Sequence, residues 1–73
     1  MKFSINDKYV VLGFKNGNLQ LRRKLLDMGL VKGTIFQIKK AAPFGNCFVI
    51  FLRNYYLCID KANLDFVNLS LVQ

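Results

Sequence analysis

The sequence predicts a small, mostly β barrel of about five strands, with one short helix inserted between the first and second strands. Three observations lead to this prediction. Short runs rich in β-branched and aromatic residues recur along the 73 residues, with short connections between them. Only one stretch has helical spacing, and it lies between the first two runs. Because closing a small sheet leaves few exposed edges, a barrel suits this pattern, and the length fits a single domain, 1–73.

The first strand is expected over residues 8–14, after a polar and apolar lead-in that turns at residues 6–7. The sequence KYVVLGF is typical of a strand, and Gly13 is the expected site of a β-bulge. A loop is expected over 15–18, because its Asn-Gly pair tolerates positive φ angles.

The helix is expected within the stretch 19–33, which reads LQLRRKLLDMGLVKG. Its apolar residues recur at i, i+4 and i+7 and would form one stripe: Leu21, Leu25 and Met28, widened by Leu26. Polar residues occupy the other side: Gln20, Arg22, Arg23, Lys24 and Asp27. Asn18 is placed to cap the N-terminus with its side-chain oxygen. Gly29 is expected to end the helix in the left-handed conformation, with Leu30 folding back onto the stripe.

Two further strands are expected over 34–40 and 66–72, where apolar and polar residues alternate. In the first of them, Phe36 and Ile38 would face the core. The connection over 41–46 contains the only proline of the chain, and a short turn is expected through 61–63.

A β-hairpin is expected over 47–60, with a two-residue turn at Arg53-Asn54. This turn would pair residues on a core face: Leu52 with Tyr55, Ile50 with Leu57, and Phe48 with Ile59. The other face holds Cys47, Val49, Phe51, Tyr56, Cys58 and Asp60. It is largely apolar, which a sheet with one solvated side does not require. Either another segment covers this face, or the face is a contact patch for a partner.

The composition favours a packed domain with an acidic partner. Hydrophobic residues make up 53% of the chain, which argues against disorder, yet no run approaches the roughly 20 apolar residues of a membrane span. The N-terminal residues lack the apolar core of a signal peptide, so a cytoplasmic protein is expected. The net charge of +7 favours nucleic acid, an anionic membrane or an acidic protein face, although it can also serve solubility alone.

Neither catalysis nor a cofactor is expected. The chain has no histidine and no glutamate, which removes the commonest general bases. It also lacks the G-x-x-x-x-G-K-[ST] loop that binds nucleotide phosphates. Its four acidic residues are scattered rather than paired: Asp7, Asp27, Asp60 and Asp65.

A metal centre is not expected either. Cys47 and Cys58 are eleven residues apart, and no histidine can complete a site with them. In the expected hairpin they are diagonal neighbours, about 7–8 Å apart at Cα, which is beyond comfortable disulfide reach. We expect two free thiols that behave as small apolar side chains.

The segment RRKLLDMGLVKGT, residues 22–34, resembles the RRRLLDMGL-x-x-GT motif of the FeoA family, small partners in bacterial ferrous iron uptake. The loop at 42–46 is similar to the AP-x-GD loop of the family, and Ala62 stands where its late turn has an alanine. The similarity extends over roughly residues 8–72. It implies an SH3-like barrel with a helix inserted after the first strand.

The chain departs from the family pattern at three positions. Asn54 stands where the hairpin turn usually has glycine, but asparagine also tolerates positive φ, so the turn should form. Asn46 and Cys47 stand where the family loop usually has aspartate and proline. These two changes argue against transferring any function of that loop.

The resemblance implies a non-catalytic accessory protein of ferrous iron uptake. Its partner would be FeoB, a membrane iron transporter with a cytosolic GTP-binding domain, which would hold the chain at the inner face of the membrane. The same barrel also occurs as a regulatory domain of iron-dependent repressors of the diphtheria-toxin-repressor type. Since no helix-turn-helix precedes the barrel here, we expect the transport role. That role does not require the chain itself to bind a transition metal ion.

Two groups of residues are the expected partner-binding surfaces. The first is the basic side of the helix, which either contacts acidic protein or lipid headgroups or is simply solvated: Arg22, Arg23 and Lys24. The second is the outer hairpin face, which would supply contact energy or weak self-association if uncovered: Cys47, Val49, Phe51 and Tyr56.

Nucleic-acid binding is the remaining alternative, although it is not expected. Small barrels bind single strands through aromatic residues on a basic sheet face. The residues concerned are Lys39 and Lys40 near Phe36 and Phe44, and Tyr55 and Tyr56 beside Arg53. An exposed aromatic pair flanked by basic residues would indicate such a surface.

Overall fold

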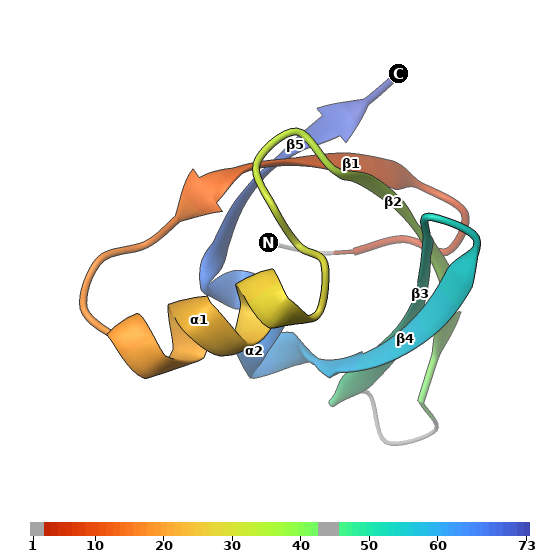
Figure 1. The fold of residues 1–73 in the computed structure, drawn as a ribbon. Coiled ribbons are helices and arrows are strands. Elements are labelled where there is room, and N and C mark those ends of the chain that lie inside the picture. Colours follow the sequence, from red (N-terminus) through yellow and green to blue (C-terminus); the bar gives the residue numbers. More distant parts are fainter. Residues whose placement is uncertain (1–2, 43–45) are drawn as a thin grey trace.

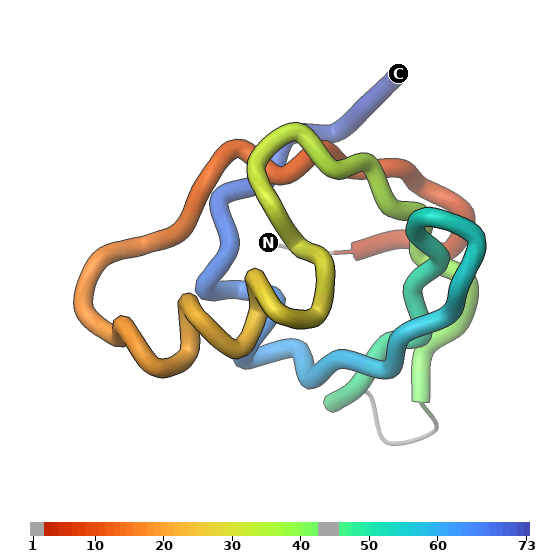
Figure 2. Tube along the Cα trace, viewed as in Figure 1, coloured from red at the N-terminus to blue at the C-terminus, as the bar shows by residue number. Residues whose placement is uncertain are grey.

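The computed structural model describes residues 3–42 and 46–73. Its elements follow in this order (Figure 1): β1 (Lys8–Phe14), α1 (Leu19–Asp27), β2 (Ile35–Ala41), β3 (Cys47–Leu52), β4 (Tyr55–Asp60), α2 (Lys61–Asp65) and β5 (Val67–Val72). The strands form one antiparallel sheet in the order β4-β3-β2-β1-β5. Figure 2 shows the strands curving around a common interior, with α1 at one side of the ring. The predicted β barrel with a helix between its first two strands is confirmed.

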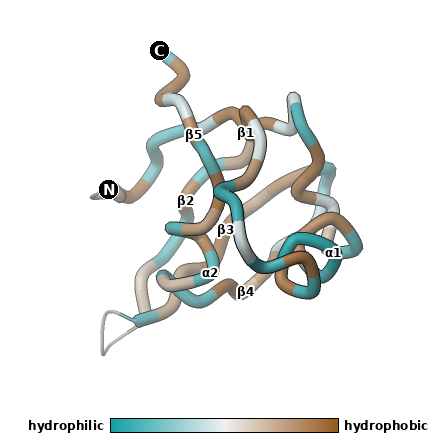
Figure 3. The backbone as a smooth tube through the Cα atoms, turned by 90° about the vertical axis from the view of Figure 1, so that its left-hand side faces the viewer, coloured by the Kyte–Doolittle hydropathy of each residue, from teal (hydrophilic) through white to brown (hydrophobic). Residues whose placement is uncertain are grey.

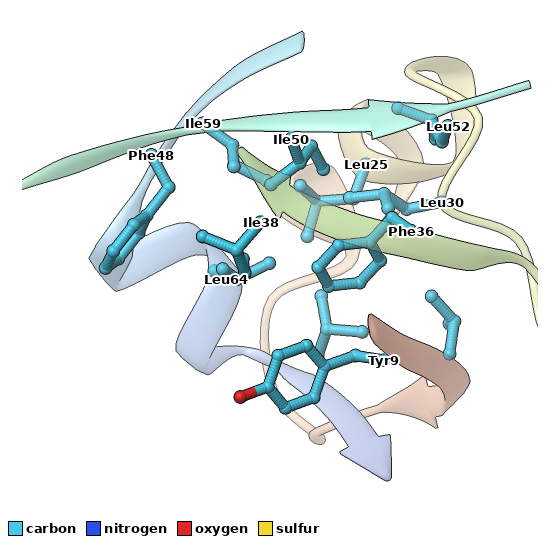
Figure 4. Packing of buried hydrophobic residues seen from close by; sticks show 12 residues of the cluster. Tyr9, Leu25, Leu30, Phe36, Ile38, Phe48, Ile50, Leu52, Ile59 and Leu64 are labelled. Atoms are coloured by element: carbon cyan, nitrogen blue, oxygen red, sulfur yellow. The ribbon is translucent and has the colours of Figure 1, made fainter. Parts of the chain in front are cut away.

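Apolar side chains from all five strands and both helices fill the interior of the barrel. The fully or nearly fully buried residues are Tyr9, Val11, Leu25, Leu30, Phe36, Ile38, Phe48, Ile50, Leu52, Ile59, Leu64 and Val67. Figure 4 shows Leu25 of α1 and Leu64 of α2 pointing among the strand residues. Each such leucine stabilises the fold by roughly 1.5–3 kcal/mol through removal of its surface from water.

Both ends of α1 form as predicted. The side chain of Asn18 accepts a hydrogen bond of 2.9 Å from the backbone N–H of Leu21. Gly29 has a φ of +98° and its N–H donates to Leu26 O at 3.0 Å, while the N–H of Leu30 donates to Leu25 O at 3.1 Å. These two bonds make a Schellman motif, which ends the helix and turns Leu30 into the core.

The core stripe of α1 is narrower than expected. Only Leu25 is fully buried, whereas Leu21 and Met28 are half-buried at the margin of the core. Leu26 was expected to widen the stripe, and that prediction is wrong. It lines a surface hollow together with Leu19, because a residue one position after Leu25 is rotated by about 100° around the helix.

The hairpin has the predicted register. Leu52 lies opposite Tyr55, Ile50 opposite Leu57, and Phe48 opposite Ile59. Arg53 and Asn54 have φ angles of 45° and 66°, which is the pattern of a type I′ turn. Tyr55 does not lie in the core, as had been expected, because it stands at the end of the hairpin and is 39% exposed.

The other strands confirm most of the predicted details. The register of β1 against β5 shifts between Val11 and Gly13, where a bulge was expected. Phe36 and Ile38 of β2 are buried, and a second register shift follows Ile38. The predicted connection at 41–46 lies in part outside the described residues.

The turn expected through 61–63 is instead the short helix α2. Its five residues are too few to show a helical period in the sequence, and Leu64 alone is fully buried. The N–H of Lys61 donates to Asn46 O at 2.9 Å, which ties the start of α2 to the start of β3. Within the described residues, no helix has the length and apolar character needed to cross a membrane.

Candidate partner-binding surfaces

The residues predicted to bind a partner lie on two separate surfaces. Arg22, Arg23 and Lys24 lie on α1, which faces the barrel interior with Leu25. The hairpin residues lie on the outer face of β3 and β4, since the core residues of these strands point the other way. We call the second group, Cys47, Val49, Phe51 and Tyr56, the hairpin surface.

The outer side of α1 combines basic and apolar side chains. Arg22, Arg23 and Lys24 are all exposed, and Leu19 beside them is 78% exposed. A hollow of about 310 Å³ runs along this side, lined by Leu19, Arg22, Arg23 and Leu26. We call these four residues together with Lys24 the helix surface. Figure 3 shows hydrophilic and hydrophobic positions alternating around α1.

A second hollow lies beside the first on α1. It has a volume of about 580 Å³ and is lined by Leu19, Gln20, Arg23, Lys24, Asp27 and Met28. Leu19 and Arg23 border both hollows, so they occupy the ridge between them. The only acidic residue in this lining is Asp27, at the C-terminal end of the helix.

Arg22 is exposed and also contacts an aromatic ring of the same chain. Its guanidinium carbon lies 5.8 Å from the centre of the Phe14 ring, and that ring lies 6.2 Å from the ring of Phe66. A cation–π contact of this kind orients the arginine without neutralising its charge. Arg22 therefore remains available to an anionic partner in a defined orientation.

The hairpin surface is not covered by any described part of the chain. Tyr56 is 64% exposed, and its ring lies 4.9 Å from the ring of Phe51, directly across the β3–β4 ladder. Val49 and Cys47 continue the surface along β3 and are half-buried. Of the two alternatives left open by the sequence, cover by another described segment is not observed, and the surface is partly open to solvent.

Basic residues lie along one edge of the hairpin surface. A hollow of about 280 Å³ beside Phe51 is lined by Lys8, Ile35, Gln37, Phe51, Leu52, Arg53 and Asn54. Lys40 lies opposite Val49 in the β2–β3 ladder and is exposed. Of the four aromatic residues named from the sequence for nucleic-acid contact, Tyr55 and Tyr56 are exposed, Phe36 is buried, and Phe44 lies outside the described residues.

A family model for the FeoA domain matches residues 2–69 of the chain. The chain belongs to the FeoA family. A search of curated proteins finds no match.

Solved structures of FeoA proteins have the same fold. An FeoA-like protein from Clostridium acetobutylicum is 30% identical, with a TM-score of 0.89 over 99% of this chain and 83% of that one. The iron(II) transport protein A from Clostridium thermocellum is 22% identical, with a TM-score of 0.87 over 97% of this chain and 43% of that one. The Stenotrophomonas maltophilia FeoA, described as a prokaryotic SH3 domain protein and solved with zinc, is 15% identical, with a TM-score of 0.77 over 94% and 85%. The fold is thus the SH3-like barrel implied by the sequence motif.

The two cysteines of this FeoA-family chain lie on the outer face of the hairpin. Cys58 lies opposite Val49 and Cys47 opposite Asp60, so the two thiols are diagonal neighbours, and both are free. A hydrogen bond to the Cys58 thiol, with burial and the negative charges of ionised Cys58 and Asp60, raises the pKa of Cys47 above its usual value. Among the described residues, no three His, Cys, Asp or Glu side chains are grouped to hold a metal ion.

The exposure of Leu19 on the outer side of α1 was not predicted from the sequence. The signal was present, because Leu19 and Leu26 are seven residues apart and so lie on one line of the helix, two turns from each other. That line lies about 100–120° around the helix from Leu25 and passes between Arg22 and Arg23.

Proposed function

We propose that this FeoA-family chain is a non-catalytic accessory protein of bacterial ferrous iron uptake. In this proposal it binds the cytosolic part of a FeoB-type iron transporter and modulates it, which holds the chain at the inner face of the cell membrane. Membership of the FeoA family supports the role in iron uptake. The relative from Stenotrophomonas maltophilia is described as a candidate activating factor for ferrous iron transport, which agrees with it.

The observation that carries the proposal is the uncovered hairpin surface. The Tyr56 ring packs against the Phe51 ring at a tilted angle and exposes 64% of its surface, whereas every other described aromatic residue except Tyr55 is buried or half-buried. Tyrosine is enriched among the residues that dominate binding energy at protein interfaces, because it offers a large rigid contact and a polar tip. The half-buried Val49 beside this pair would extend the contact at little cost in side-chain entropy.

The residue types support an action by binding rather than by chemistry. The chain has no histidine or glutamate, and its aspartates are spread over different elements. A change in transporter activity would then follow from the difference in affinity of the chain for two transporter conformations. The hairpin surface is also the surface through which weak self-association would occur.

A second candidate function is binding of single-stranded nucleic acid, favoured by one observation. Tyr56 is exposed, and the half-buried Phe51 in contact with it lines a hollow together with Lys8 and Arg53. Small basic barrels bind single strands by stacking bases on aromatic residues beside basic ones. Such binding would weaken steeply with salt, because it depends on phosphate contacts. A tyrosine-dependent protein interface would change much less.

The experiment measures binding of the purified chain to the purified cytosolic domain of the transporter from the same cell. Tyr56→Ser should weaken binding about tenfold or more, because a central interface tyrosine commonly contributes above 1.4 kcal/mol. Leu12→Ser is the matched control, since Leu12 is also apolar and 51% exposed but lies on β1. The proposal fails if wild type does not bind, or if both variants bind alike. Salt-sensitive binding to an oligonucleotide instead, lost in Tyr56→Ser, would establish the second function.

A further inference from the structure

We propose that the helix surface binds the anionic headgroups of a phospholipid bilayer directly. In this binding mode Leu19 and Leu26 enter the interfacial region of the bilayer, and Arg22 and Arg23 on either side of them contact lipid phosphates. Lys24 lies farther around the helix and adds its charge to the attraction. The inference goes beyond the proposed function, because it requires no transporter and uses a surface other than the hairpin surface.

The apolar part of this site is a short ridge. Leu19 and Leu26 are two helical turns apart, which places them about 10 Å from each other along α1. Leu19 exposes 78% of its surface, the largest fraction among the exposed large hydrophobic residues of the described chain. Both leucines line the same hollow, so they are accessible from one side of the helix.

The charges are arranged on both sides of this ridge. Arg22 and Arg23 line the hollow with the two leucines, and Lys24 follows in the second hollow beyond Arg23. The first turn of α1 carries no acidic residue, and Asp27 lies at the far end of the helix. A helix that lies on a bilayer has this pattern, with apolar residues inserted and long basic side chains reaching to the headgroups.

A bilayer fits this surface better than an acidic protein does. Leu19 is the first residue of α1, is 78% exposed and borders both open hollows, so a protein would need a matching groove to bury it. A fluid interface needs no such groove. The positive charge of the whole chain, +7, adds a long-range attraction to an anionic leaflet.

The test uses phosphatidylcholine vesicles with and without phosphatidylglycerol, and the full chain without any transporter. We expect the wild type to sediment with the anionic vesicles only, and less as salt rises. Arg22→Glu with Arg23→Glu should lower the partition coefficient at least about twentyfold, since each basic residue near a membrane contributes about fivefold. Lys39→Glu with Lys40→Glu is the control, because both lysines are exposed on β2 and their reversal changes the net charge equally.

A fluorescence experiment tests the orientation. The chain contains no tryptophan, so Leu19→Trp introduces a single reporter. Its emission should shift to the blue on addition of anionic vesicles, whereas the emission of Leu12→Trp on β1 should not. If the double arginine variant fails to fold, Arg23→Glu with Lys24→Glu replaces it and spares the contact of Arg22 with Phe14.

Three results would overturn the inference. The first is an absence of binding to anionic vesicles. The second is an equal loss of binding in the arginine and lysine variants, which would reveal a response to net charge alone. The third is binding of the arginine variant to vesicles as strong as wild type while its binding to the transporter domain is lost, which would make the helix surface a protein contact.

Discussion

The phenolic hydroxyl of Tyr55 donates a hydrogen bond to the main-chain oxygen of Met28, and so joins the tip of the β3–β4 hairpin to the end of α1. This contact explains why the residue that terminates the helix, Gly29, is a glycine. An ideal Cβ at Gly29 would lie 2.7 Å from the Tyr55 hydroxyl oxygen, and the φ of Gly29 is +98°. Met28 and Gly29, which belong to the sequence motif at residues 22–34, therefore both contribute to the junction between the helix and the hairpin.

The first prediction is that substitutions of Gly29 and Tyr55 change the free energy of unfolding in a non-additive way. Gly29→Ala should cost roughly 2–3 kcal/mol of unfolding free energy, from the left-handed backbone and from displacement of the tyrosine hydroxyl. Tyr55→Phe alone should cost about 1 kcal/mol through loss of the hydrogen bond. In the double variant the alanine meets only ordinary contacts, so the total should be about 1 kcal/mol less than the sum of the two. Chemical denaturation of the four proteins measures this; strict additivity would show that the two residues act separately.

Thr34 and Arg53 give a second prediction at the same junction. Thr34 is 6% exposed, and its hydroxyl donates to Gly29 O at 3.3 Å and accepts from the Arg53 guanidinium at 3.0 Å. Thr34→Val keeps the shape but removes both bonds, so it should cost about 1–2 kcal/mol, or a fall in melting temperature of roughly 4–15 °C. Arg53→Met should cost less, because it removes one of the two bonds. An equal effect of both variants would contradict this account.

The hairpin turn provides the third prediction. Asn54 has a φ of 66°, which costs a residue with a Cβ about 1–2 kcal/mol unless its side chain is suited to that region, as that of asparagine is. Asn54→Ala should therefore lower stability by about 1 kcal/mol. Asn54→Gly should leave stability unchanged or raise it, because glycine adopts this conformation freely. Thermal unfolding of both variants measures the difference, and a lower melting temperature for glycine than for alanine would contradict it.

The sequence predicted the hairpin register and both ends of α1 because each depends on local chemistry. A two-residue turn fixes which residues pair in the two strands that it joins. The capping contacts at Asn18 and Gly29 involve only residues a few positions away in the chain. The position of Tyr55 could not be predicted in this way. Alternation placed it in the core, but its exposure depends on where the end of α1 lies, and no local pattern contains that information.

The candidate surfaces were predicted only in part, because local patterns show which residues share a face but not whether another segment covers that face. The basic residues of α1 and the apolar residues of the outer hairpin face could be read from helix and strand periods. Whether the hairpin surface is covered depends on the path of the whole chain, and the structure shows Tyr56 exposed. The short helix α2 has no period to detect, and Leu64 forms it by packing into the core.

The fourth prediction concerns the cysteine pair and pH. The hydrogen bond with Cys58, followed by burial and the nearby negative charges, raises the pKa of Cys47, so less of its reactive thiolate is present at a given pH. Replacing Cys58 with alanine removes the hydrogen bond and one of the charges, and should lower the pKa of Cys47. Alkylation of Cys47 by iodoacetamide, followed by mass spectrometry of its peptide, should then begin at lower pH in Cys58→Ala than in wild type. Val67→Ala, a buried substitution on β5 away from the hairpin, controls for a general loosening of the fold. If the pH dependence of Cys47 alkylation is the same in Cys58→Ala as in wild type, the two thiols do not interact.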